Sequence, residues 1–302
     1  MCCSQGYPLK LWINKQDIRM LFIFFGLTTR LTNFPRNSLM WRLLVFSHTM
    51  KRGSMSNSNA IPQPIQYKHS SLTVTQSNAL IESCYRLSLE EKRLVMASAA
   101  QVDPRYSVPD EITTTAEAYA EIFNIKIDAA YQQIRSAADS LYDRTIKMKN
   151  KDDQGREVNV EMRWIYRKAI TKPRSGQVTL SFSPDIKPFL GDLKDRFKSY
   201  KIDHVKGLKS IHSIRLYELL YQYKDIGYRW FLVPDFREKF CLEGLYPRDA
   251  DLKRWVVRPA AKEVTKKTNL DVDVQFEKKA RGRGTQKIWF NFSLKPQLAM
   301  PF

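Results

Sequence analysis

The spacing of hydrophobic residues changes within residues 246–294, and this change predicts a helix followed by two strands. Asp249 can cap the start of the helix, and Asp251 suits its positive first turn. At about 100° per residue, the arc predicted to face the core carries Leu252, Trp255, Val256, Pro259 and Ala260. The opposite arc carries Arg254, Arg258, Ala261, Lys262 and Thr265. We therefore expect a helix with one buried and one cationic face.

Apolar and polar residues alternate after Asn269, as they do along strands. The alternation predicts strands at residues 270–276 and 288–294, joined by a turn that contains glycine. Basic residues gather at this turn: Lys278, Lys279, Arg281, Arg283 and, just beyond it, Lys287. A helix beside a basic hairpin is typical of a winged helix, because the helix can reach base edges while the hairpin contacts phosphates. An amphipathic surface helix beside a solvated hairpin is the alternative.

The rest of the chain predicts a repeated order of elements. In the first half, the pattern predicts helices at residues 76–84, 88–99, 116–123 and 128–141, a short strand at 111–115, and a hairpin of strands at 158–166 and 178–182. In the second half, it predicts a helix at 209–224, a short strand at 230–233 and a short helix at 234–242, before the helix and hairpin described above. We therefore predict an α+β chain with two tandem winged-helix domains.

The two predicted domains divide the chain at residue 200. Residues 76–200 form the first domain, to which we assign dimerisation because its long helix carries both acidic and basic side chains. Residues 201–302 form the second and main DNA-reading domain. Auxiliary phosphate contacts in the first domain would come from Arg167, Lys168, Lys172 and Arg174.

Residues 1–54 differ from the rest of the chain because their apolar patches have no sustained period. A signal peptide is the alternative for the apolar segment at residues 20–27, but the small residues of a cleavage site do not follow it. We expect residues 1–54 to be an unstructured upstream extension, with the protein starting at Met50 or Met55. Residues 55–75 are then predicted to be a flexible N-terminal arm.

The charge of the chain points to a polyanionic partner. Of its 302 residues, 50 are Lys or Arg and 31 are Asp or Glu, which gives a net charge of +19. Residues 201–302 carry 21 basic and 12 acidic residues, whereas residues 55–200 carry 21 and 18. Because the excess is concentrated in the predicted reading domain and no apolar run approaches about 18 residues, we expect double-stranded DNA as the partner rather than a membrane.

No pattern of Cys or His predicts a metal site, a cofactor or a catalytic centre. Cys84 and Cys241 are isolated, so the sequence indicates neither a disulfide framework nor a zinc site, and a reducing cytoplasm is expected. The four histidines lack the spacing of a rolling-circle nicking enzyme, and no phosphate-binding loop motif is present. We therefore expect a protein that is not an enzyme.

Several runs between residues 70 and 296 resemble the Rep_3 (RepB-type) family of plasmid replication initiators. These runs are residues 80–94 (LIESCYRLSLEEKRL), 216–220 (LYELL), 251–254 (DLKR), 259–264 (PAAKEV) and 288–292 (IWFNF). The resemblance implies a bacterial cytoplasmic protein that binds directly repeated sequences, called iterons, at a plasmid origin through two winged-helix domains. It also implies opening of the adjacent A·T-rich DNA and recruitment of the host initiator and replicative helicase. By the same resemblance, monomers bind iterons and are in equilibrium with a homodimer, which binds an inverted repeat and represses its own gene.

Candidate DNA contacts of two kinds lie in the reading segment, which is Arg248 and the predicted helix that follows it, and in the basic hairpin beyond it. Arg248 and Arg254 match family residues at the DNA-reading helix, and an arginine can contact guanine through two hydrogen bonds. The candidates for phosphate contact are Lys253, Arg258, Lys262, Lys278, Lys279, Arg281, Arg283 and Lys287. Pro259 is unusual inside a helix and predicts a bend there.

Two other functions fit the same sequence. One is a winged-helix transcriptional repressor without an initiation role, and the other is a protein that coats nucleic acid without sequence choice. Tandem repeats beside A·T-rich DNA near the gene would favour initiation, and a lone inverted repeat would favour repression. Equal affinity for any duplex at matched salt would favour coating.

Overall fold

The computed structural model describes residues 72–171, 176–281 and 284–296. The first element is strand β1 (Thr73–Ser77), which pairs antiparallel with β8 (Phe197–Lys201). A strand that begins at Thr73 contradicts the flexible arm expected up to residue 75. Sequence spacing could not show this strand, because Thr75 pairs with Ser199, 124 residues later.

Helices α4 (Leu89–Ala99), α5 (Ala116–Phe123) and α6 (Ile127–Leu141) confirm the helical pattern of the first domain. Ser88 caps α4 and forms a capping box with Glu91. The buried residues of α6 recur at helical spacing: Ala130, Ile134, Ala137, Ala138 and Leu141. The first predicted helix is too long, because α3 (Asn78–Glu82) ends before strand β2 (Cys84–Tyr85).

The strands of the first domain form two three-stranded sheets. One has the order β2–β4–β5, with β4 (Thr145–Lys151) and β5 (Glu157–Arg163). The other has the order β3–β7–β6, with β3 (Ile112–Thr115), β6 (Ile165–Ile170) and β7 (Gln177–Phe182). The single strand predicted at residues 158–166 is wrong, because the fully buried Trp164 separates β5 from β6. The prediction missed β4, whose residues are mostly exposed and therefore lack an apolar alternation.

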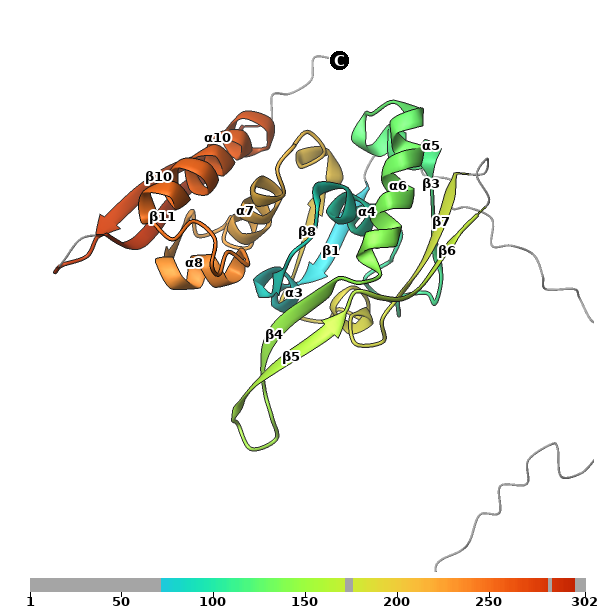
Figure 1. Cartoon of the computed structure of the whole chain (residues 1–302), viewed down its shortest axis with the longest axis horizontal. Helices are drawn as coiled ribbons and strands as arrows, with labels where there is room; N and C mark the ends of the chain where they lie inside the picture. Colours follow the sequence, from blue (N-terminus) through green and yellow to red (C-terminus); the bar gives the residue numbers. More distant parts are fainter. Residues whose placement is uncertain (1–71, 172–175, 282–283, 297–302) are drawn as a thin grey trace, which may run out of the picture. The chain divides into compact units, whose positions relative to one another are not determined.

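The second domain contains the predicted helix and hairpin. Strands β10 (Leu270–Lys278) and β11 (Thr285–Leu294) form the hairpin, and β9 (Tyr228–Leu232) pairs with the other edge of β11. Helices α7 (Ile211–Tyr221), α8 (Val233–Lys239), α9 (Asp249–Leu252) and α10 (Arg258–Lys267) complete this half of the chain. Figure 1 shows α10 lying along the β10–β11 hairpin, which it contacts through β10. Short 3-10 turns lie at Lys187–Phe189 and Ile202–His204.

A buried polar cluster connects α7 to α4, β1 and β8. The carboxylate of Glu218 lies 2.8 Å from the ammonium of Lys92 on α4, and neither side chain is more than 1% exposed. Glu218 also accepts hydrogen bonds from Tyr200 at 2.6 Å and Gln76 at 2.8 Å. Because α7 also packs against α10, this cluster links the first domain to the helix beside the hairpin.

A disulfide joins Cys84 on β2 to Cys241, which follows α8. The Cα atoms are 5.6 Å apart, so the expectation that these two cysteines are isolated is wrong. Their separation of 157 residues in the sequence conceals a proximity that arises only when α8 packs against β2. Arg86 adds a second connection here, because its Nε donates to the carbonyl of Cys241 at 2.9 Å.

Candidate nucleic-acid interface

The predicted reading helix is interrupted by a wide turn. Residues Lys253–Val257 form a π-helical turn, in which the backbone N–H of Arg258 donates to the carbonyl of Lys253. Pro259 follows in the first turn of α10. A proline cannot donate a backbone hydrogen bond, and its ring conflicts with the carbonyl four residues earlier in a regular helix. A π turn next to the proline locally replaces this regular geometry, as π bulges in helices do.

The π turn also changes which side chains face the core. Each π turn contains an extra residue, so the residues that follow it are rotated relative to a regular helix. Trp255 is 57% exposed and Pro259 is exposed, although both were predicted to face the core. Ala261 is buried, although it was predicted on the cationic arc. The helical arc computed at a constant 100° per residue is therefore wrong at these three positions.

The exposed face carries cations whose charge no carboxylate among the described residues neutralises. Arg254, Arg258 and Lys262 are exposed and form no ion pair with the described residues. Instead, the guanidinium of Arg254 lies 4.8 Å from the ring centre of Trp255. The Nζ of Lys253 lies 4.4 Å from the ring centre of Phe276 on β10, and the guanidinium of Arg258 lies 5.6 Å from it. Aromatic rings therefore position these cations and leave their charge available to an anion.

The pKa of Lys253 reflects this concentration of charge. Partial burial lowers the pKa of the Lys253 ammonium, and the neighbouring charges of Arg258 and Lys278 lower it further. Asp249 opposes the shift but does not reverse it. A bound polyanion would relieve the repulsion among these three cations.

Arg248 has a different environment from Arg254. It occupies the N-cap position of α9, and its side chain is 81% exposed. Its Nε lies 2.8 Å from the carboxylate of Asp251 in the same helical turn. An exposed pair of this kind contributes about 0.3–0.5 kcal/mol, so a stronger acceptor could displace Asp251. Arg248 is thus accessible to a ligand, but Asp251 already neutralises part of its charge.

The hairpin of β10 and β11 supplies a second group of free cations. Lys278, Lys279 and Arg281 are exposed at its turn, while Arg283 lies outside the described residues. Lys287 differs, because it lies 3.2 Å from the carboxylate of Glu277 and 5.2 Å from the ring centre of Trp230. Lys287 is therefore held on the sheet by two neighbours, whereas the turn cations project into solvent.

Asp249 fixes the turn end of this hairpin, where β11 begins, against α9, a role that the sequence did not indicate. Arg248, not Asp249, occupies the N-cap position. The Oδ2 of Asp249 accepts a hydrogen bond from the backbone N–H of Thr285 at 2.8 Å. A Cβ on Gly284 would lie 3.0 Å from the same oxygen, and the φ of Gly284 is +124°, so glycine suits this close approach. Asp249 thereby positions the hairpin beside the reading segment.

The auxiliary candidates in the first domain are paired or lie outside the described residues. Arg167 forms an ion pair with Glu111, and Lys168 lies 2.6 Å from the carboxylate of Asp139. Lys172 and Arg174 lie outside the described residues. The two described candidates, Arg167 and Lys168, are therefore paired and do not form a free basic surface like that of the second domain.

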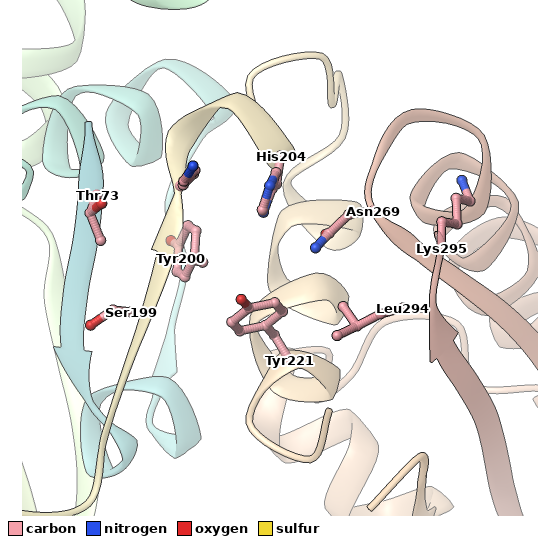
Figure 2. Close-up of a pocket in the computed structure, with 9 residues that line it drawn as sticks. Thr73, Ser199, Tyr200, His204, Tyr221, Asn269, Leu294 and Lys295 are labelled. Carbon is pink, nitrogen blue, oxygen red and sulfur yellow. The ribbon is translucent and has the colours of Figure 1, made fainter. Parts of the chain in front are cut away.

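A separate cavity of about 510 Å³ is lined by residues of β1, β8, α7 and the end of β11. Figure 2 shows the side chains of His204, Asn269 and Lys295 around it. These groups already have partners, because the hydroxyl of Tyr217 lies 3.0 Å from Asn269 Oδ1 and 3.3 Å from His204 Nδ1, and Lys295 donates to the carbonyl of Thr268. Burial and the charge of Lys201 hold the pKa of His204 below its usual value. The cavity is thus a hydrogen-bonded junction, and it does not include the cations of the reading segment.

Within residues 72–171, 176–281 and 284–296, no group of His, Cys, Asp and Glu is arranged to hold a metal ion. No helix among the described residues combines the length and apolar character needed to cross a membrane.

Models of two protein families match the chain in succession. Residues 73–221 match the Initiator Replication protein WH1 domain, and residues 232–292 match the Initiator Rep protein WH2 domain. A replication initiation protein of Escherichia coli is 28% identical over 240 residues, which make up 76% of this chain and 72% of that protein. An uncharacterized 27.6 kDa protein of Escherichia coli is 26% identical over 219 residues, or 66% of this chain and 87% of that protein.

A solved structure supports the same fold. The Pi initiator protein, crystallised in complex with iteron DNA, matches this chain with a TM-score of 0.62 and 22% identity, over 75% of this chain and 99% of that one. The match confirms the predicted α+β fold with two winged-helix domains. The consecutive WH1 and WH2 matches establish that this chain belongs to the Rep_3 family of plasmid replication initiators.

Proposed function

We propose that this protein initiates plasmid replication by binding iteron repeats at the plasmid origin through the reading segment and hairpin of its second domain. It then promotes opening of the adjacent A·T-rich DNA and brings host replication proteins to the site. We further propose that it acts by binding rather than by catalysis, as a monomer on iterons. In its dimeric form it represses its own gene.

The cationic surface of the second domain is the main support for this function. Arg254, Arg258 and Lys262 on one side and Lys278, Lys279 and Arg281 on the other are exposed without carboxylate partners among the described residues. Asp249 holds the hairpin next to the helix through Thr285. A helix and a hairpin held side by side can contact base edges and flanking phosphates at the same time.

The environments of the cations suggest separate roles. Arg254 is the stronger base-reading candidate, because its guanidinium is held by an aromatic ring and has no competing carboxylate among the described residues. Arg248 would first have to leave Asp251. The other cations of this surface, including Lys253, would contact phosphates, and Lys287 would do so least because Glu277 already engages it.

Family membership supports the initiation role over simple repression. The replication initiation protein of Escherichia coli shares sequence with both domains, and the Pi initiator was solved with iteron DNA. We propose that the same class of DNA is bound here. We also propose that the first domain mediates dimerisation and supplies weaker phosphate contacts, because its two described candidate cations, Arg167 and Lys168, are paired with carboxylates.

Footprinting on the DNA that flanks the gene tests this function. We expect protection of tandem repeats spaced by about two helical turns beside an A·T-rich segment. Protection of a lone inverted repeat would indicate a repressor without an initiation role. Protection without sequence preference at matched salt would indicate a coating protein and contradict the proposal.

Two variants separate base reading from phosphate contact. Arg254→Ala is expected to weaken binding to the footprinted repeat much more than to random DNA, since one bidentate contact contributes about 1–3 kcal/mol of discrimination. Replacing Lys279 and Arg281 by Ala should weaken binding to both DNAs and reduce the slope of log affinity against log salt by about 2. Arg156→Ala is a matched control, because this exposed cation is already paired with Asp152. Equal losses for Arg254→Ala on both DNAs would remove Arg254 from base reading.

A further inference from the structure

Trp255 is the largest apolar side chain on the cationic surface of the reading segment. It is 57% exposed, although Leu252 just before the wide turn and Val256 within it pack into the core, each 1% exposed. The π turn at Lys253–Val257 carries Trp255 out of the core and onto the surface shared by Arg254 and Arg258. An exposed indole among free cations adds nothing to the core and is therefore available for contact with a ligand.

Trp255 and Arg254 lie in contact, and together they offer this surface an apolar group and a hydrogen-bond donor. The guanidinium of Arg254 lies 4.8 Å from the ring centre of Trp255, which restricts where its donors can point. Trp255 stays 57% exposed beside this contact. In the major groove, the 5-methyl group of thymine is the apolar feature of the base edges, and it is read by apolar side chains.

We propose that Trp255 is a specificity-determining residue that contacts the 5-methyl group of a thymine, next to the base that Arg254 contacts. This inference rests on the proposed binding of the reading segment to the major groove. It assigns the π turn a role in recognition, because a regular helix through the same residues would direct Trp255 into the core. Trp255 would then recognise an apolar feature of one base pair, and Arg254 would recognise the polar edge of its neighbour.

Single replacement of thymine by deoxyuridine tests the contact directly. Deoxyuridine lacks only the 5-methyl group, so the hydrogen bonds and phosphates of the duplex are retained. The probe is the duplex protected in the footprint of the flanking DNA, prepared with each thymine replaced in turn. At the contacted thymine, the loss of one buried methyl group should weaken binding of the unaltered protein about fourfold.

Variants at position 255 link the methyl effect to this side chain. Trp255→Ala should bind the thymine duplex more weakly than the unaltered protein does. It should also bind the duplex with thymine at the contacted position and the duplex with deoxyuridine there with equal affinity. Trp255→Phe should retain part of the discrimination. Tyr106→Ala is the matched control, because Tyr106 is also exposed, at 66%, and its ring lies 5.7 Å from the neighbouring Arg105 guanidinium, but it is not among the candidate DNA contacts.

The outcomes separate this inference from the function on which it rests. If the unaltered protein protects repeats but no deoxyuridine replacement weakens it, the methyl contact is refuted and the proposed function stands. The same conclusion follows if deoxyuridine at the contacted position weakens binding of Trp255→Ala by the same factor as binding of the unaltered protein. Another residue would then read the methyl group. If no flanking DNA is protected, both the proposed function and this inference are overturned.

Discussion

Replacing Glu218 by Gln should destabilise the protein more than any change to an exposed ion pair. The Glu218 carboxylate is fully buried and lies 2.8 Å from the Lys92 ammonium. Gln has nearly the same shape, so the substitution leaves no large cavity. It removes the negative charge, however, and leaves the buried Lys92 without a counter-charge among its described neighbours.

The magnitude follows from the burial of both partners. Breaking a buried ion pair by removing one charge costs about 3–5 kcal/mol, a large share of a total stability of about 5–15 kcal/mol. The carboxylate also accepts from Tyr200 and Gln76 and lies 4.0 Å from Arg215. An amide can replace only part of this set of acceptor contacts. We therefore expect Glu218→Gln to cost about 3–5 kcal/mol.

Urea unfolding followed by circular dichroism measures this loss through the midpoint of the transition. Glu161→Gln is the matched control, because Glu161 lies 3.9 Å from Lys147 with both side chains exposed. The control should change stability by less than about 1 kcal/mol. Replacing Lys92 by Met together with Glu218 by Leu should recover part of the stability, because the buried ammonium is removed together with the carboxylate. Arg215 loses its carboxylate but keeps hydrogen bonds to Tyr85 and to the carbonyl of Ser83. A Glu218→Gln loss below about 1 kcal/mol, with no recovery in the double variant, would refute the reasoning.

The same pair predicts the response to acid. Burial alone would raise the pKa of Glu218, but the charges of Lys92 and Arg215 outweigh it and lower the pKa below its ordinary value of 4.5. The stabilisation is therefore present above pH 4.5 and is lost as the pH falls towards the folded-state pKa. Glu218→Gln should show a weaker dependence of the urea midpoint on pH in this acidic range.

Three further predictions concern local contacts. Ser88→Ala should lower stability by about 1 kcal/mol in thermal unfolding, because it removes the N-cap of α4; an unchanged melting temperature would contradict the capping box. Asp249→Ala should speed hydrogen exchange at the Thr285 amide, which loses its acceptor, and equal exchange rates would show that the hairpin is held otherwise. A reducing agent should lower the stability of the unaltered protein by about 2–4 kcal/mol but leave Cys84→Ser unaffected, and equal responses would argue against the disulfide.

Local patterns were sufficient where an element is stabilised mainly by its own sequence. Helix α5 was predicted at its observed bounds, and the buried positions of α6 recur at the helical spacing of the sequence. The β10–β11 hairpin was also predicted, because one face of each strand is consistently apolar. The charge excess of the second domain follows from composition alone.

Long-range pairing could not be obtained in this way. Strand β1 depends on β8, and β4 has too few apolar residues to reveal its pairing with β5. The disulfide between Cys84 and Cys241 depends on the packing of α8 against β2. Each feature requires a partner that is distant in the sequence, and residue periodicity contains no information about that partner.

The reading segment shows the same division within a few residues. By itself, the sequence determined that residues 249–267 are helical, basic and followed by a basic hairpin. Only the tertiary structure decided which side chains face solvent, because the π turn before Pro259 rotates Trp255 outward and Ala261 inward. It also decided which cations remain free, since Asp251 engages Arg248 and Glu277 engages Lys287, while Arg254 is held by an aromatic ring. Charge is a property of composition, whereas the availability of that charge depends on which carboxylates the fold brings within reach.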